Sequence, residues 1–127
     1  MATKSRFLLE QFLNNNQQQP LLIVSNMKFK PYNFVNLPAE TEERELHVKS
    51  EWQLLLNKKA ESGKAYLVIT NLDEVSITQQ ELFIGLIKDK RAGSYKLPIN
   101  VQIIMPVKNG DVISEKIKKL SLVWSAE

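Results

Sequence analysis

Short continuous apolar segments alternate along this chain with segments in which apolar residues recur every three or four positions. The apolar runs predict buried strands, and they lie at 21–26, 33–38, 65–72, 100–107 and 120–124. The periodic segments predict helices, and they lie at 3–16, 42–59, 77–90 and 112–119. Strands that alternate with helices indicate an α/β domain. We expect three layers, with a mainly parallel sheet of about five strands and helices on its faces.

Polar residues mark where several of these helices begin. Thr41 is placed to cap the helix over 42–59, and Asp111 is placed to cap the one that starts at 112. Ser76 and Gln79 form a capping-box pattern in front of the helix over 77–90. Residues 91–98 read as a loop with room for a small hairpin.

Length and composition indicate a single domain over residues 1–127, in which 1–19 form an N-terminal helix and a polar linker. The chain is 43% hydrophobic and 24% charged, as in ordinary globular proteins. It has no cysteine, which excludes disulfides, a thiol nucleophile and sulfur-bound zinc. No apolar run reaches the length that spans a bilayer. We therefore expect a cytoplasmic protein that does not bind membranes.

The net charge of +3 is mild, and its one local concentration lies near the C-terminus. Lys116, Lys118 and Lys119 fall on the short helix predicted over 112–119. A solvated helix face explains them better than nucleic-acid binding, because no aromatic-rich basic strand accompanies them. We do not expect nucleic acid as a partner.

The segment "AYLVITNLDEVS" at 65–76 carries the strongest candidate chemistry. Asp73 and Glu74 directly follow its strand, and Asn109 lies just after another predicted strand. Ligands of open parallel sheets bind at the carboxyl ends of the strands. Asp73 and Glu74 either hold magnesium and activate water or form a solvated strand end before a helix, where carboxylates are stabilised in any case. Asn109 followed by Gly110 is also an ordinary turn dipeptide.

The passage "YLVITNLDEVSITQQELFIGLIKDKRAGSYKLPINVQIIMPVKN", residues 66–109, resembles the middle of an AAA+ ATPase domain. It is most similar to the MoxR-like and dynein-related branch, and a fainter similarity extends over 20–124. The resemblance implies a truncated P-loop NTPase-like fold. It also implies that Asp73 and Glu74 form a Walker B motif, in which Asp73 would bind Mg²⁺ and Glu74 would polarise water. Asn109 would then be the sensor 1 residue.

Two other parts of the ATPase pattern, the phosphate loop and the arginine finger, are missing. A phosphate loop needs glycines, a lysine and a hydroxyl after the first strand, but "MKFKPYNFVNLP" follows there. The single Gly-Lys pair, Gly63-Lys64, precedes a strand instead of following one. Lys118 and Lys119 stand where the family has an arginine finger, and lysine cannot reproduce the arginine fork. We therefore expect no bound cofactor and no hydrolysis by this chain alone.

Two functions remain open at this point. In the first, a reduced and degenerate AAA+-like domain acts without catalysis, as a protein-interaction or self-assembly module such as a homodimer. The missing phosphate loop and its helix would leave part of one sheet face for a partner, or the segment 3–16, to cover. In the second, the chain is a Walker B-bearing subunit that uses a partner's phosphate loop to bind or hydrolyse ATP. His47, the only histidine, has no metal-binding partners in the sequence, and Trp52 and Trp124 read as core residues.

Overall fold

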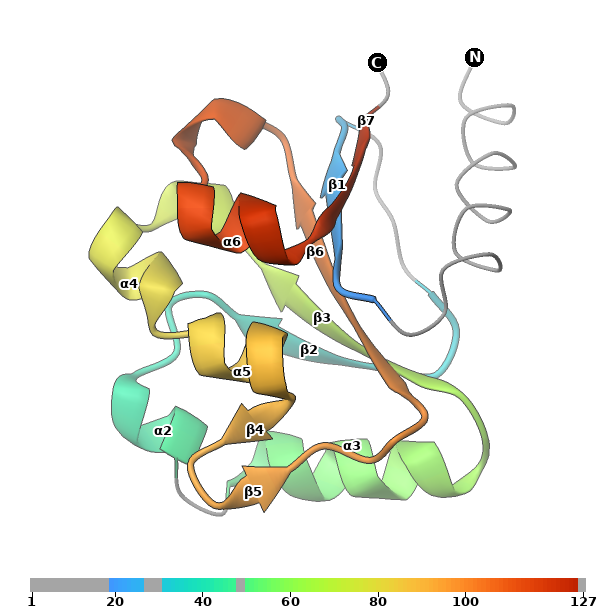
Figure 1. Cartoon of the computed structure of the whole chain (residues 1–127). Coiled ribbons are helices and arrows are strands. Elements are labelled where there is room, and N and C mark those ends of the chain that lie inside the picture. Colours follow the sequence, from blue (N-terminus) through green and yellow to red (C-terminus); the bar gives the residue numbers. More distant parts are fainter. Residues whose placement is uncertain (1–18, 27–30, 48–49, 126–127) are drawn as a thin grey trace.

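A five-stranded parallel sheet forms the centre of the protein (Figure 1). The computed structural model describes residues 19–26, 31–47 and 50–125, except for the side chain of His47. The strand order is β2-β3-β6-β1-β7, with bounds β1 Leu21–Val24, β2 Phe34–Pro38, β3 Ala65–Thr70, β6 Val101–Val107 and β7 Leu122–Ser125. A separate antiparallel hairpin joins β4 (Arg91–Ala92) to β5 (Tyr95–Lys96), within the loop predicted over 91–98.

The helices follow the strands in alternation, as the apolar pattern predicts. The α-helices are α2 Glu43–His47, α3 Glu51–Glu61, α4 Ile77–Glu81, α5 Ile84–Asp89 and α6 Glu115–Leu120. Two single turns of 3₁₀ helix, η1 Leu72–Glu74 and η2 Gly110–Val112, follow β3 and β6. The helix predicted over 3–16 and most of the linker to residue 19 lie outside the described residues.

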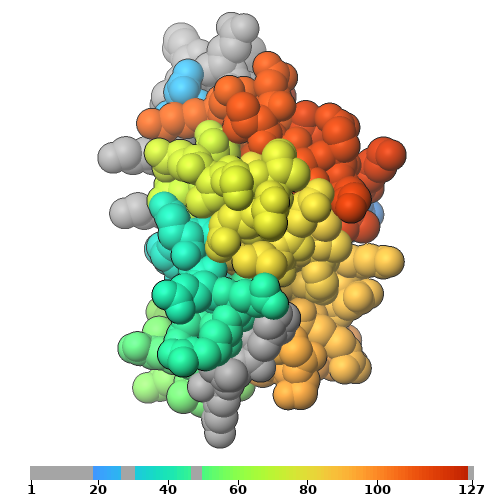
Figure 2. Space-filling model, turned by 90° about the vertical axis from the view of Figure 1, so that its left-hand side faces the viewer, coloured from blue at the N-terminus to red at the C-terminus, as the bar shows by residue number. Residues whose placement is uncertain are grey.

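The described helices pack on one face of the sheet. The connections from β2 to β3, from β3 to β6 and from β6 to β7 all step in the same direction across the sheet. Right-handed crossovers place the helices of such connections on the same side. Their apolar side chains, among them Trp52, Leu56, Ile87 and Ile117, join the strand residues of that side in the larger core cluster. Figure 2 shows α4 and α5 between α2 and α6.

The opposite face carries a smaller cluster made of strand residues. Leu21, Ile23, Val68 and Ile104 alternate along their strands with the residues of the larger cluster, as the period-two pleat requires. These four side chains are at most 3% exposed. This part of the sheet face is therefore buried in the protein. The connection from β1 to β2, residues 25–33, is shorter than the dozen or so residues of a usual helical crossover.

Two of the predicted helices are interrupted. The segment 77–90 divides into α4 and α5, because Leu82 and Phe83 form a turn between them. The segment 42–59 divides at Ser50, whose extended backbone (φ −121°, ψ 169°) precedes α3. Thr41 does not cap a helix: its Oγ1 donates to the carbonyl oxygen of Pro38 at 2.6 Å. A periodic apolar face continues across both breaks, so periodicity alone did not reveal them.

The ends of three other elements also differ from the prediction. The strand predicted over 65–72 ends at Thr70, because Asn71 adopts a left-handed backbone (φ 63°). The C-terminal helix begins at Glu115 rather than at 112, so Asp111 does not cap it. The final strand covers Leu122–Ser125. Within the described ranges, no helix has the length and apolar character needed to cross a membrane.

Candidate functional site

The carboxyl edge of the sheet brings together the three residues that the sequence singles out. Asp73 and Glu74 lie in η1, directly after β3, and Asn109 follows β6. β3 and β6 are neighbours in the sheet, so their ends meet. The left-handed backbone of Asn71 turns the chain out of the strand, which places both carboxylates in a helical turn rather than at the end of an extended strand.

Asp73 fixes the chain that leaves β6. Its Oδ2 accepts hydrogen bonds from the backbone N–H of Lys108 at 2.9 Å and of Asn109 at 3.1 Å. A carboxylate that accepts backbone N–H groups makes stronger hydrogen bonds than a neutral acceptor does. One oxygen of Asp73 therefore has a structural role: it ties the end of β3 to the end of β6.

Asn109 also has a local structural role. Its Oδ1 accepts a hydrogen bond from the backbone N–H of Asp111 at 3.0 Å, so the side chain caps η2. Asparagine is a known source of such turns, in which its side chain bonds the backbone two residues further along. The sequence therefore contained a signal for this cap, although the Asn-Gly pair predicted only a turn.

We expect Asn109→Ala to lower the free energy of unfolding by about 0.5–1 kcal/mol, because one N–H at the start of η2 loses its acceptor. Urea unfolding monitored by circular dichroism measures this loss. Asn57→Ala is a control of the same type, since the only hydrogen bond of the Asn57 side chain within the described residues is the one that its Oδ1 accepts from the Tyr95 hydroxyl, at 2.7 Å among exposed atoms. An unchanged midpoint for Asn109→Ala would show that the cap does not stabilise the fold.

Glu74 differs from Asp73 in its surroundings. It is exposed, and its N–H donates a hydrogen bond to the carbonyl oxygen of Asn71 at 2.9 Å. Within the described chain, no group of three or more histidine, cysteine, aspartate or glutamate side chains is arranged to hold a metal ion. The structure thus brings Asp73, Glu74 and Asn109 to one edge and engages Asp73 and Asn109 in the turns there.

The end of β1, where a phosphate loop would begin, is joined closely to the same turns. Residues 25–33 contain no glycine. The N–H of Ser25 donates to the carbonyl oxygen of Val107 at 2.9 Å, which extends the pairing of β1 with β6 beyond Val24. A Cβ on Gly110 would lie 3.1 Å from Cγ2 of Val24, so η2 packs directly on the last residue of β1.

Two glutamines of α4 hold this edge together, and sequence reasoning missed one of them. Gln79 was predicted as a capping residue, and its N–H does bond Ser76 Oγ at 3.1 Å. Its side chain, however, donates to the carbonyl oxygens of Ala39 and Thr41, both at 2.9 Å. The side chain of Gln80 bonds η2 and the start of α6. These contacts link segments more than 30 residues apart, so no local sequence pattern predicts them.

The Gly63-Lys64 pair lies at the opposite edge of the sheet, at the start of β3. Lys64 Nζ bonds Gln102 Oε1 at 3.0 Å and lies 5.3 Å from the centre of the Tyr66 ring. Burial, and secondarily the charge of Lys90, lower the pKa of Lys64 below its ordinary value. This placement agrees with the sequence argument that the pair does not form a phosphate loop.

Comparisons with known proteins identify the fold and nothing finer. No family model matches the chain, and no curated protein matches it. Among solved structures, the chain is similar to a DNA polymerase III gamma subunit-related protein from Thermotoga maritima. The TM-score is 0.55 at 8% sequence identity, and the match covers 94% of this chain but 45% of that one. The chain thus spans less than half the length of that protein and shares its α/β fold, with a parallel sheet and helices packed on it as in P-loop NTPase cores.

Proposed function

We propose that this chain is a reduced AAA+-like domain that has lost catalysis and acts as a protein-interaction or self-assembly module. The proposal includes the assignment of residues 66–109 to the MoxR-like and dynein-related branch, which these residues resemble in sequence. The observation that carries it is the engagement of Asp73 Oδ2 by two backbone N–H groups. The residue that would bind magnesium in an active ATPase serves here to hold two strand ends together.

The surroundings of Asp73 support the same conclusion. A bound nucleotide needs backbone N–H groups that wrap its phosphates after β1. Here Gly110 packs on Val24 at that place, and residues 25–33 lack glycine. The oxygen of Asn109 that would sense the nucleotide accepts the N–H of Asp111. These residues do not fit a magnesium-bound nucleotide, and we derive no catalytic step from them.

Apolar exposure supports a binding role. Ile99 is 86% exposed, Val123 on the edge strand β7 is 51% exposed, and Leu54 on α3 is 53% exposed. The strands β2 and β7 both end the sheet, so each presents an edge of backbone that no described strand pairs with. Such edges and apolar side chains are where protein partners, or further copies of a chain, attach.

We expect the purified chain to fold and to form dimers or larger assemblies, and we expect Mg²⁺-ATP to leave its melting temperature unchanged. Differential scanning fluorimetry measures the second property, and light scattering after gel filtration measures the first. A ligand that binds only the folded state raises the melting temperature. A clear shift with Mg²⁺-ATP, or an ATPase activity that is lost in Glu74→Gln, would refute the proposal.

The second candidate is a Walker B-bearing subunit that receives a phosphate loop from a partner protein. The observation in its favour is the exposure of Glu74 at the carboxyl edge. It predicts ATPase activity that arises only on mixing with a partner, such as the product of a neighbouring gene, and that disappears in Asp73→Asn. Mixtures that remain inactive would leave the non-catalytic role as the better proposal.

A further inference from the structure

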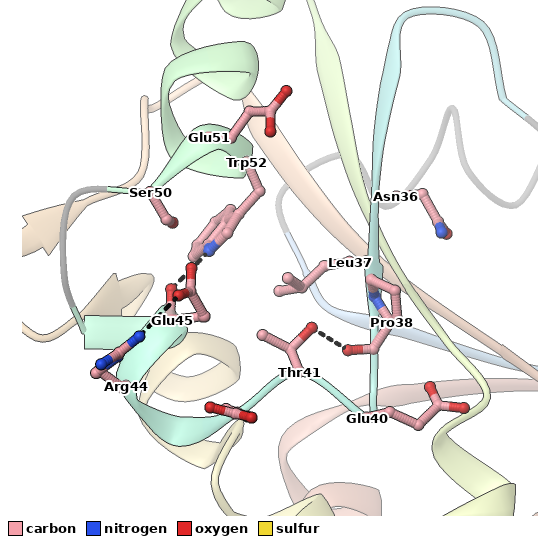
Figure 3. A pocket seen from close by; sticks show the side chains of 11 residues that line it. Asn36, Leu37, Pro38, Glu40, Thr41, Arg44, Glu45, Ser50, Glu51 and Trp52 are labelled. Carbon is pink, nitrogen blue, oxygen red and sulfur yellow. Dashed lines mark hydrogen bonds and ion pairs between the residues drawn. The ribbon is translucent and has the colours of Figure 1, made fainter.

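A continuous groove runs beside the edge strand β2. One cavity of about 600 Å³ lies between the carboxyl end of β2, α2 and the start of α3 (Figure 3). A second cavity of about 390 Å³ lies between β2 and α3. The two share Asn36, Glu51 and Trp52 in their walls, so they form one groove along the strand. Leu55, which is 44% exposed, and Phe34 add apolar surface to its narrower part.

The backbone of β2 faces this groove with groups that have no partner among the described residues. Tyr66 N–H donates to the carbonyl oxygen of Asn33, and Ala39 N–H donates to that of Thr70, so the odd-numbered residues of this segment bond β3. In a parallel pair the intervening residues point their N–H and C=O groups to the other side. Phe34 and Asn36 therefore present two N–H and two C=O groups outward, and Pro38, which has no N–H, ends that row.

The wider part of the groove is acidic in a chain of net positive charge. Its walls include four glutamates and one arginine: Glu40, Glu42, Glu45, Glu51 and Arg44. Arg44 and Glu45 approach to 4.0 Å, but their side chains are 79% and 46% exposed, so the pair is screened by water. The whole chain carries a net charge of +3. The walls of this cavity therefore carry a net negative charge, opposite in sign to that of the whole chain, which favours a cationic ligand.

A buried hydroxyl in the same wall has no partner in the described structure. Ser50 is 8% exposed, and its Oγ makes no hydrogen bond, although Ser50 precedes α3 and would be expected to cap it. An unsatisfied buried hydroxyl costs free energy that a ligand donor or acceptor would recover. Trp52, beside it, is held by a hydrogen bond from Nε1 to the carbonyl oxygen of Glu45 at 3.0 Å, so the wall of the cavity is fixed (Figure 3).

We propose that β2 receives an extended, basic peptide segment of a partner protein, which adds as a sixth strand. Its backbone pairs with Phe34 and Asn36, its apolar side chains lie against Trp52 and Leu55, and a lysine or arginine enters the acidic cavity. Strand addition to an edge beside a helix obtains affinity from backbone hydrogen bonds and specificity from alternate side chains. This inference rests on the proposed function and names the chemistry of its partner.

The test is fluorescence polarisation of the full chain with a labelled peptide in which lysine and valine alternate. We expect saturable binding, and we expect E40Q/E45Q/E51Q to weaken it by about tenfold or more. The control E61Q/D89N/E115Q removes the same formal charge from exposed positions away from the groove and should bind as the unmodified chain does. A peptide in which glutamate replaces lysine should not bind.

Backbone N-methylation of the peptide distinguishes strand pairing from adsorption by charge. Methylation at every second residue removes the N–H groups of one side of the strand. One of the two alternating series should lose at least about tenfold in affinity, while the other keeps binding. Equal binding of both series, or of the glutamate peptide, would overturn the inference.

One further result would contradict the peptide as the ligand of the groove without contradicting the proposed interaction role of the chain. If the peptide does not bind, but the chain forms a dimer that E40Q/E45Q/E51Q dissociates, the groove receives a second copy. That result overturns the peptide as occupant and leaves the interaction role intact. Binding of Mg²⁺-ATP would instead contradict the proposed function, whatever the peptide does.

Discussion

Replacing Gln80 by leucine should lower the free energy of unfolding by about 3 kcal/mol. Gln80 is 1% exposed. Its Nε2 donates to the carbonyl oxygens of Val75 at 3.2 Å and Val112 at 2.9 Å, and its Oε1 accepts the N–H of Ser114 at 2.7 Å. Leucine has a similar volume but leaves these buried backbone groups without partners. Urea unfolding at neutral pH measures the loss.

Gln53→Leu is the matched control, because Gln53 is also a buried glutamine. It is 2% exposed, and its Nε2 has no hydrogen-bond partner among the described residues. Leucine at this position removes an unsatisfied buried group, so we expect the stability to stay the same or to rise. If the two substitutions cost equally, the polar contacts of Gln80 do not hold the carboxyl edge together.

Replacing Asp73 by alanine should lower the free energy of unfolding by about 2 kcal/mol, because two charge-assisted hydrogen bonds to Lys108 and Asn109 are lost. The bonded atoms are partly accessible to water, which keeps the expected loss below that of Gln80. Glu74→Ala should change stability by less than about 0.5 kcal/mol, as is usual for an exposed side chain. Chemical unfolding of the two variants in parallel measures the difference.

A residue kept only for catalysis would behave differently. Active sites are commonly built at a cost in stability, so the loss of a catalytic carboxylate leaves stability unchanged or raises it. A higher unfolding free energy for Asp73→Ala than for the unmodified chain would therefore contradict the structural role of Asp73. Asp73→Asn retains an acceptor oxygen but not the charge. We expect its unfolding free energy to lie between that of the unmodified chain and that of Asp73→Ala.

The strands and the fold class were predictable because they depend on local composition. The runs at 65–72 and 100–107 are apolar without interruption, as befits strands buried on both faces, and they became β3 and β6. The alternation of strands with helices then indicated a parallel sheet. The resemblance of 66–109 to AAA+ domains predicted the fold, which the likeness to a solved structure supports.

The breaks in the helices and the roles of the site residues were not predictable in the same way. Leu82 and Phe83 have the apolar spacing of a helix, and Phe83 packs in the core, so the local pattern gives no sign of the turn between α4 and α5. The hydrogen bonds of Asp73 to Lys108 and Asn109 join residues that are 35 and 36 positions apart in the sequence. They form only because β3 and β6 are neighbours in the sheet, and no local sequence pattern reveals the order of the strands.

The groove beside β2 shows the same limit. Trp52 was interpreted as a core residue, and it is indeed buried. In the structure, the glutamates and Trp52 line a cavity beside β2. This arrangement depends on the position of β2 at the edge of the sheet, which the sequence alone does not give. The cluster of carboxylates over 40–45 was the one signal available in the sequence.

Direct calorimetric titration of the full chain with Mg²⁺-ATP tests most sharply whether the carboxyl edge is structural rather than catalytic. We expect no heat of binding up to millimolar nucleotide, because Asp73 is engaged and no loop after β1 can wrap the phosphates. Saturable binding that Asp73→Asn weakens, measured on protein that is shown to be folded, would contradict this conclusion.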